Sequence, residues 1–246
     1  MGEEKGGRGT GVTGPGTQLI PFPYMRCLCG LVFLFIASCS STETGYFPTA
    51  PGHEWTYDIR RIVPEFNEPI VQKSIVRNLP ARTVGDITYY PKAYANGSIR
   101  HFTRSADGIS RRNPGHEGAD PVIGYPLSVG SEWSAGSRLY LFDLPKKLEG
   151  AWDRISSNLE LDYTITSLDD PVDVPAGYFP RCLRIDAIGF LDLPRRLMLG
   201  IRIIKVEQSQ WYAPGVGLVK MTRKEYAIPN LYPSEYTQAL TSFKRK

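Results

Sequence analysis

The chain has few cysteines and histidines, two residue types that often build metal centres and nucleophilic sites. Its 246 residues include four cysteines and three histidines. His53, His101 and His116 are far apart, with no cysteine or carboxylate at the spacing of a metal site. The phosphate-binding patterns G-x-x-x-x-G-K-[ST] and G-x-G-x-x-G and the nucleophile pattern G-x-S-x-G are absent. We therefore predict no catalytic residues, no metal and no cofactor, and a protein that is not an enzyme.

The chain also lacks a strong charge imbalance and a long apolar segment. Its 29 basic and 25 acidic residues leave a net charge of only +4, which argues against nucleic acid as a partner. No apolar run approaches the ~20 residues that span a bilayer as a helix. The apolar share of 41% and the aromatic share of 11% are instead typical of a folded globular domain.

The apolar run that is present, residues 27–36, has the features of a secretory signal. It follows Met25 and the positively charged Arg26, and small residues come directly after it. A buried strand or core helix would explain neither the arginine nor the small residues. We predict a signal peptide at 25–38, with the glycine-rich residues 1–24 as a disordered or spurious extension and Met25 as the true start.

The end of this run, Ile36-Ala37-Ser38-Cys39, resembles the lipobox of bacterial lipoproteins. The resemblance implies that Cys39 receives a diacylglyceryl group and that a peptidase cuts between Ser38 and Cys39; ordinary cleavage without lipid is the alternative. Residues 39–45 would then tether the domain to a membrane without a spanning helix. Ser40, rather than Asp, favours the periplasmic face of the outer membrane.

Residues 46–228 have the pattern of an antiparallel β domain. Leu159, Leu161, Tyr163 and Ile165 alternate with polar residues, which is typical of a half-buried strand. Further strands alternate with turns such as Asn96-Gly97, and prolines interrupt any long helix. We predict a mainly β fold, a single antiparallel curved sheet forming a half-barrel or a sandwich. We expect little helix: one short helix near 148–156, and a turn or helix at 236–243 within a C-terminal tail, 229–246.

A short pattern occurs twice, 78 residues apart. Residues 48–56 and 126–134 share P-x-x-x-G-x-E-W-[TS], which suggests a Pro/Gly turn that leads into a strand starting with a core tryptophan. The two copies indicate either two related β subunits or a recurring way of entering a strand. We treat Trp55, Trp133, Trp211 and Tyr212 as aromatic residues of the core or of a ligand site, with the core favoured for tryptophan.

Three motifs carry a resemblance to a broad group of bacterial lipoproteins and secreted proteins. They are Y-P-L-x-V-G-x-x-W at 125–133, V-P-A-G-x-F at 174–179 and W-Y-A-P-G-V-G-L-V-K at 211–220. The resemblance implies an architecture similar to periplasmic lipoprotein carriers, in which a curved sheet holds an acyl chain. At the level of a fold, this implies no particular function.

Three functions remain open. We favour a lipid-anchored, non-catalytic envelope protein that acts in binding or assembly, with the membrane as a partner through the anchor and an envelope protein or hydrophobic ligand as a second partner. The alternative is a carrier of a lipid or other hydrophobic ligand in a concave pocket. An enzyme that uses Cys182 or a histidine is least supported, because the sequence offers Cys182 no adjacent base and a packed strand thiol explains it better.

Overall fold

The computed structural model describes residues 45–64, 68–112, 118–140, 159–193, 202–228 and 233–245. All of them belong to one compact unit, 41–246. The predicted signal peptide, Ser38 and Cys39, His116 and the predicted helix at 148–156 lie outside the described residues, so these predictions stay predictions.

The described part of the chain is built of β-strands, with no helix. The strands are β1 (Glu54–Ile62), β2 (Ile70–Asn78), β3 (Arg82–Val84), β4 (Ile87–Tyr94), β5 (Ile99–Ser105), β6 (Gly108–Arg111), β7 (Asp120–Gly124), β8 (Glu132–Gly136), β9 (Glu160–Val174), β10 (Gly177–Asp192), β11 (Ile203–Ala213), β12 (Gly217–Ile228) and β13 (Ser234–Lys244). The alternation of buried and exposed residues that predicted them is clear in β12, where every second side chain is buried.

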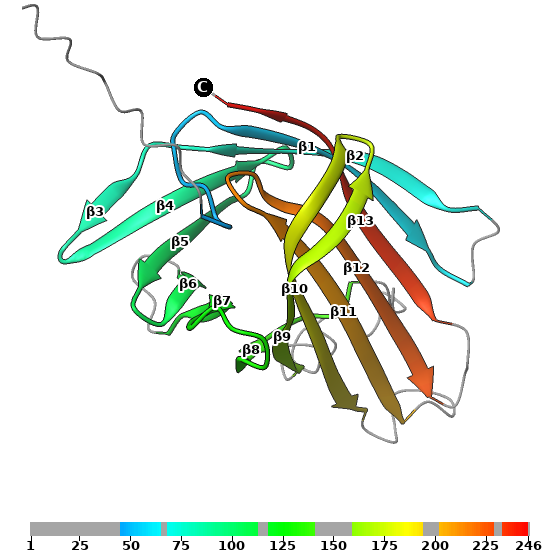
Figure 1. Cartoon of the computed structure of the whole chain (residues 1–246). Helices are drawn as coiled ribbons and strands as arrows, with labels where there is room; N and C mark the ends of the chain where they lie inside the picture. Colours follow the sequence, from blue (N-terminus) through cyan, green and yellow to red (C-terminus); the bar gives the residue numbers. More distant parts are fainter. Residues whose placement is uncertain are drawn as a thin grey trace, which may run out of the picture. The chain divides into compact units, whose positions relative to one another are not determined.

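The strands form one antiparallel sheet of 13 strands. Its order is β7-β6-β5-β4-β2-β1-β13-β12-β11-β10-β9-β8, and β3 pairs with β4 off this path. In Figure 1, β4 to β6 lie on one side and β10 to β12 on the other, joined through β2, β1 and β13. The predicted fold class, a mainly β protein with a single curved antiparallel sheet, is confirmed.

The two ends of the strand order, β7 and β8, are brought together by curvature. They are consecutive in the chain, and the Trp133 ring of β8 lies directly against Gly124 of β7: a Cβ on Gly124 would be 2.7 Å from Cε3 of Trp133. The sheet is therefore nearly closed into a barrel, and it has an inner and an outer face. Trp55, Tyr57 and Ile59 of β1 are buried on the inner face.

The repeated pattern marks two equivalent strand entries. Glu54 is the first residue of β1 and Glu132 the first residue of β8. Two residues before each glutamate is a glycine with positive φ, 83° at Gly52 and 88° at Gly130, a backbone conformation that favours glycine. Each copy is thus a turn that delivers a tryptophan into a strand, which agrees with the strand-entry interpretation.

The prediction for the C-terminus is wrong. Residues 234–244 form β13, in the middle of the sheet between β1 and β12, where a tail with a turn or helix at 236–243 was expected. The physical reason is tertiary pairing: β13 completes the ladder of a strand that begins 180 residues earlier in the chain, and a local pattern does not show such a partner.

Candidate functional site

A row of paired residues crosses the inner face from β2 to β8. Directly paired residues on neighbouring strands point to the same side of a sheet, so the whole row shares the inner face with Trp55 and Tyr57. The row consists of Ile70, Arg61, Tyr236, Arg223, Gln208, Ala187, Tyr163 and Trp133. Most of these side chains are polar, although burying a polar group costs free energy that an aliphatic residue would avoid.

Arg223 is the centre of the polar part of this row. Its side chain and that of Glu225 are completely buried, and Arg223 Nε donates to Glu225 Oε1 at 2.8 Å. Nη1 donates to Gln208 Oε1 at 3.1 Å and to Ser137 Oγ at 3.2 Å, and Nη2 donates to the carbonyl of residue 138 at 2.7 Å. The guanidinium group also lies 4.3 Å from the ring centre of Tyr140, whose backbone N–H donates to Glu225 Oε1. This network fixes residues 137–140 across the inner face.

Tyrosine hydroxyl groups gather on both sides of Arg223. Burial raises the pKa of Tyr57 and Tyr212 well above the usual range, and neighbouring tyrosines raise both further. Burial raises the pKa of Tyr236 to about 12, with Tyr140 adding to the rise and the charges of Arg61 and Arg100 opposing it. These hydroxyls therefore stay protonated at neutral pH. The Tyr236 hydroxyl donates to Gln238 Oε1 at 2.8 Å, and the Tyr212 hydroxyl donates to Gln210 Oε1 at 3.1 Å.

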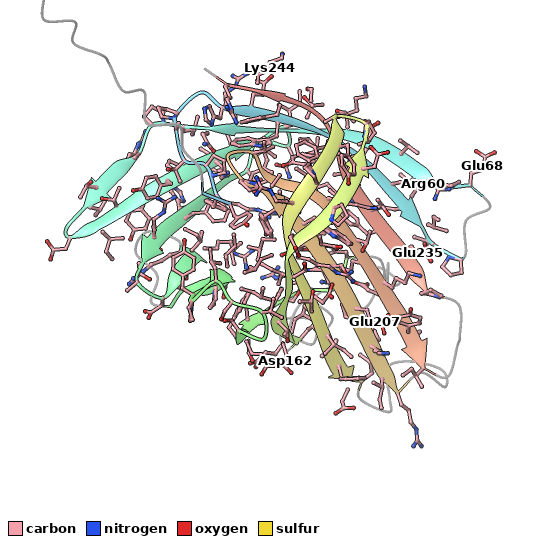
Figure 2. The ribbon with its side chains drawn as sticks, viewed as in Figure 1. Arg60, Glu68, Asp162, Glu207, Glu235 and Lys244 are labelled. Atoms are coloured by element: carbon pink, nitrogen blue, oxygen red, sulfur yellow. The ribbon has the colours of Figure 1, made fainter. Side chains whose placement is uncertain are left out.

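The inner face is rich in positive charge. Strand register and alternation place on it, among the described residues, six cationic and two anionic side chains: Arg61, Lys92, Arg100, Arg104, Arg111 and Arg223 against Asp120 and Glu225. The outer face has a more even balance, and Figure 2 labels three carboxylates on it, Asp162, Glu207 and Glu235. The positive charge thus faces the interior of the curved sheet, where an anion would be attracted.

A small pocket, which we call the entry pocket, lies where the chain enters the domain. Its volume is about 260 Å³, and its lining is mainly apolar with a single cationic side chain: Gly45, Tyr46, Phe47, Arg104, Ile109, Ile123, Tyr125 and Leu127. Arg104, Ile109 and Ile123 belong to the inner face, so the pocket is continuous with the cationic surface. Such a lining suits an apolar chain more than a polar ligand.

The predicted aromatic site residues form two groups rather than one: Trp211 packs against the cluster that contains Trp55, and Trp133 packs against the cluster that contains Tyr212. Trp55 is buried and stacks on Phe243, and its Nε1 donates to the carbonyl of Val216 at 2.7 Å. Trp133 is partly buried and stacks on Tyr163 at 5.6 Å between ring centres. Trp211 lies on the opposite face of β11 from Gln210, and its Nε1 donates to Asp170 Oδ2 at 2.7 Å. Tyr212 is buried on the inner face near Tyr163.

Cys182 is a packed thiol rather than an activated one. It is completely buried beside Val172 and Val174, and Sγ lies 3.8 Å from the carbonyl oxygen of Phe179. Burial raises its pKa to about 11, with the nearby Asp170 adding to the rise, whereas a catalytic thiol needs a lowered pKa. Of the two histidines in the described ranges, His53 packs edge-on against Trp55 and Phe243, and His101 packs against Tyr89.

Two further features are absent from the described residues. They contain no cluster of three or more His, Cys, Asp or Glu side chains placed to hold a metal ion. Within those same ranges, no helix is long and apolar enough to cross a membrane.

Apart from Tyr212, the arginines, glutamines and tyrosines of the inner face were not predicted from the sequence. One signal was available: Gln208 and Gln210 occupy alternate positions that continue the apolar Ile204 and Val206, so polar residues interrupt the buried face of a strand. That signal shows a polar interior position but not its partners, because Arg223, Tyr236 and Arg61 come from three other strands.

No protein-family model and no curated protein matches the chain. Two solved structures are similar to it. One, from Bacteroides fragilis, is described as a candidate exported protein with a YmcC-like fold; it shares 15% identity, covers 81% of this chain and 98% of its own, and gives a TM-score of 0.43. The other is a candidate lipoprotein of Parabacteroides distasonis, with 18% identity, coverage of 82% and 99%, and a TM-score of 0.40.

Proposed function

We propose that the chain is a lipid-anchored protein of the bacterial cell envelope that binds an amphiphilic ligand on the inner face of its sheet. The anchor is Cys39, at the end of the Ile36-Ala37-Ser38-Cys39 lipobox. The observation that carries the binding function is the inner face itself, where a cationic and tyrosine-rich surface is continuous with the apolar entry pocket. The proposed function is binding alone, with no reaction catalysed.

The position of the entry pocket supports the proposal that the ligand comes from the membrane. Gly45, Tyr46 and Phe47 line it; Gly45 is the last residue of the tether that begins at Cys39, and the other two directly follow the tether. An anchored domain therefore holds this pocket within a few residues of its lipid. An apolar chain entering the pocket would bury its methylene groups, each worth roughly 0.8 kcal/mol.

The inner face is reachable from solvent along β2. Ile70 and Gln72 pair with Arg61 and Ile59, which places them on the inner side, yet both are exposed. Arg100 is also exposed on this face. A ligand larger than the entry pocket can therefore extend over the cationic surface. This geometry favours the alternative that the sequence left open, a carrier of a lipid or other hydrophobic ligand.

Native mass spectrometry tests the binding function directly. The full chain is purified in mild detergent from the membranes of its own host, and we expect a bound species of defined mass. Leu127→Trp should abolish that species, because Leu127 lines the entry pocket and the larger ring fills it. Val129→Trp is the matched control, since Val129 belongs to the same loop but is 64% exposed and lies outside the pocket. Equal retention by both variants, or no bound species in the natural chain, would contradict the proposal.

Metabolic labelling with a palmitate analogue tests the anchor. The natural chain should incorporate label and sediment with the outer membrane, and Cys39→Ala should lose both properties. Cys182→Ala, which changes a buried cysteine of the domain, should keep them. Label retained by Cys39→Ala would show that the anchor is assigned to the wrong residue.

A further inference from the structure

The first half of β2 is an open edge of the sheet in the described part of the chain. β2 pairs with β1 along nearly its whole length, from Ile70 to Arg77, but it pairs with β4 only at Val76–Asn78. One further bond, from the Ala95 N–H to the Ile75 carbonyl at 2.9 Å, continues that ladder. Before Ile75, no described strand lies along the second side of β2.

The backbone groups on this open side belong to two residues. In an antiparallel ladder, the backbone groups of successive residues point alternately to one side of the strand and to the other. Ile75 bonds towards β4, and so does Leu79, because its N–H donates to the Pro91 carbonyl at 2.9 Å. In steps of two residues, the N–H and C=O groups of Val71 and Lys73 therefore point away from β1, to the open side.

The side chains of this edge are apolar for a surface strand. Val71 is 65% exposed, and Ile70 and Ile75 are 43% and 42% exposed. Figure 2 labels Glu68, directly before β2, at the right-hand margin of the molecule, whereas β4 and β5 lie on the left in Figure 1. An exposed apolar strand with unpaired backbone groups is the kind of edge that pairs with another chain.

We propose that β2 pairs with β2 of a second copy of this chain, antiparallel and around a two-fold axis at Gln72. The axis is perpendicular to the sheet, so the inner faces of both copies lie on the same side of one continuous sheet. In this register Val71 is opposite Lys73 of the partner subunit, and the two residues exchange both N–H···O bonds. The symmetric pair does the same, so the open backbone groups of both residues are bonded in both copies.

An axis one residue later, at Lys73, fits this edge less well. It would place the two copies of Lys73 directly opposite each other, and like charges in that position are destabilising. It would also pair Val71 with Ile75, whose carbonyl already accepts the bond from Ala95. The register at Gln72 avoids both problems, and it lays the aliphatic stem of Lys73 along the exposed Val71 of the partner subunit.

An axis one residue earlier, at Val71, also fits less well. It would place Lys73 opposite Pro69, which has no N–H, so the Lys73 carbonyl would stay unpaired. With the axis at Gln72, Pro69 instead lies opposite Ile75, whose carbonyl already has a donor. Proline and lysine often protect an edge from pairing, but in this register neither obstructs it. The chain bends directly before Pro69, so the paired segment ends before it reaches β4 of the other copy.

The interface is small, so the dimer should dissociate readily. One short strand from each copy buries less than the roughly 1,200 Å² of a standard interface. We therefore expect a reversible equilibrium between monomer and dimer that depends on protein concentration. Pairing at an edge covers neither face of the sheet, so the inner face stays reachable and the dimer does not depend on the bound ligand.

Cysteine cross-linking of the full chain in non-ionic detergent measures the register. Gln72 meets its own copy in a non-hydrogen-bonded pair with Cα atoms about 4.5 Å apart, a separation that a disulfide spans. The two copies of residue 71, and likewise of residue 73, lie about 7–8 Å apart on a diagonal. With copper phenanthroline as oxidant, Gln72→Cys should give roughly tenfold more covalent dimer than Val71→Cys or Lys73→Cys. The natural chain, oxidised in parallel, measures the background from its own cysteines.

A charge at Val71 tests the same register without a covalent bond. Val71→Lys puts a lysine opposite Lys73 of the partner subunit, twice in each dimer, so the dissociation constant from sedimentation velocity should rise about threefold or more. Val71→Glu puts a carboxylate there and should lower it. The controls are Val129→Lys and Val129→Glu, because Val129 is 64% exposed, almost as much as Val71, and lies off the edge. Both controls should keep the dissociation constant of the natural chain.

The dimer is overturned by any of three results. The natural chain could stay monomeric up to its solubility limit, Gln72→Cys could cross-link no more than Val71→Cys and Lys73→Cys, or Val71→Lys could dimerise as well as Val129→Lys. Cross-linking of Gln72→Cys in membranes of the host gives a fourth test. A product whose mass is not that of two chains would show that a strand of another protein occupies the edge, which also contradicts the dimer. A far-ultraviolet circular dichroism melt shows that each variant is folded.

Discussion

Replacing Arg223 by methionine should destabilise the fold strongly. Arg223 and Glu225 are both completely buried, and the guanidinium group makes four hydrogen bonds, one of them to Glu225. Methionine has a similar length but no donor, so Glu225 is left as a buried charge without its cation. Removing one partner of a buried ion pair costs about 3–5 kcal/mol.

The size of the effect on the melting temperature follows from the length of the domain. For domains of 150–250 residues, 1 kcal/mol shifts Tm by about 2–4 °C, so Arg223→Met should lower Tm by about 6–20 °C. The assay is thermal unfolding followed by circular dichroism, repeated in urea to obtain the free energy of unfolding.

The control is Lys224→Met, the same replacement at the next residue on the outer face. Lys224 pairs with Glu235 at 3.3 Å, and 47% of its side chain is exposed. Such a surface pair contributes about 0–1 kcal/mol, so Tm should fall by less than about 4 °C. Arg223→Met with Glu225→Leu should recover part of the loss, because the second change removes the unpaired charge. Equal Tm values for Arg223→Met and Lys224→Met would refute this reasoning.

Three further predictions concern the core. Burial raises the pKa of the Cys182 thiol to about 11, so this thiol should resist iodoacetamide in the native state and react in urea; fast labelling of the native protein would contradict the assignment. Because the folded state holds the thiol proton more tightly than the unfolded state, the free energy of unfolding should fall as pH rises from about 9 to about 11. Gly124→Ala should destabilise by about 1–3 kcal/mol in urea unfolding, because the added Cβ collides with Trp133. Gly136→Ala should be close to neutral, because its Cβ would lie 3.9 Å from Asp120 Oδ1, an ordinary van der Waals contact. Asn78→Ala should cost about 2–4 kcal/mol, because Nδ2 of this buried residue donates to two backbone carbonyls; a loss below 1 kcal/mol would show that water replaces it.

Those parts of the fold that depend on local pattern could be predicted from the sequence. Alternation identified β9 at Leu159–Thr166, and the Asn96-Gly97 turn correctly joins β4 to β5. Turn glycines with positive φ at Gly52 and Gly130 mark the two strand entries that the repeat indicated. Each of these features is determined by a few neighbouring residues, which is why it can be read from the chain alone.

The candidate site could not be predicted, because it depends on register between distant strands. Arg61, Tyr236, Arg223 and Gln208 become neighbours only through three separate strand pairings. A shift of one residue in any of them would turn a whole strand over, and nothing local fixes the register of β1 against β13. For the same reason β13 itself was mistaken for a tail.

Two neighbouring parts of the inner face differ in polarity, and this difference bears on the proposal that the face binds a ligand. At one end, β9, β10 and β11 fill it with Leu161, Leu191, Ile204 and Val206, so these strands can build a wholly apolar interior. In the next positions, Gln208 of β11 and Tyr163 of β9 replace aliphatic residues. Gln208 pairs across the ladder with Arg223, and Tyr163 pairs with Ala187. Buried polar groups cost free energy that aliphatic side chains avoid, and here the chain itself offsets that cost, because Gln208 accepts from Arg223 and Glu225 balances the charge of Arg223. The amphiphilic ligand proposed above therefore concerns the cationic side chains of the inner face that lie outside this buried network, such as the exposed Arg100.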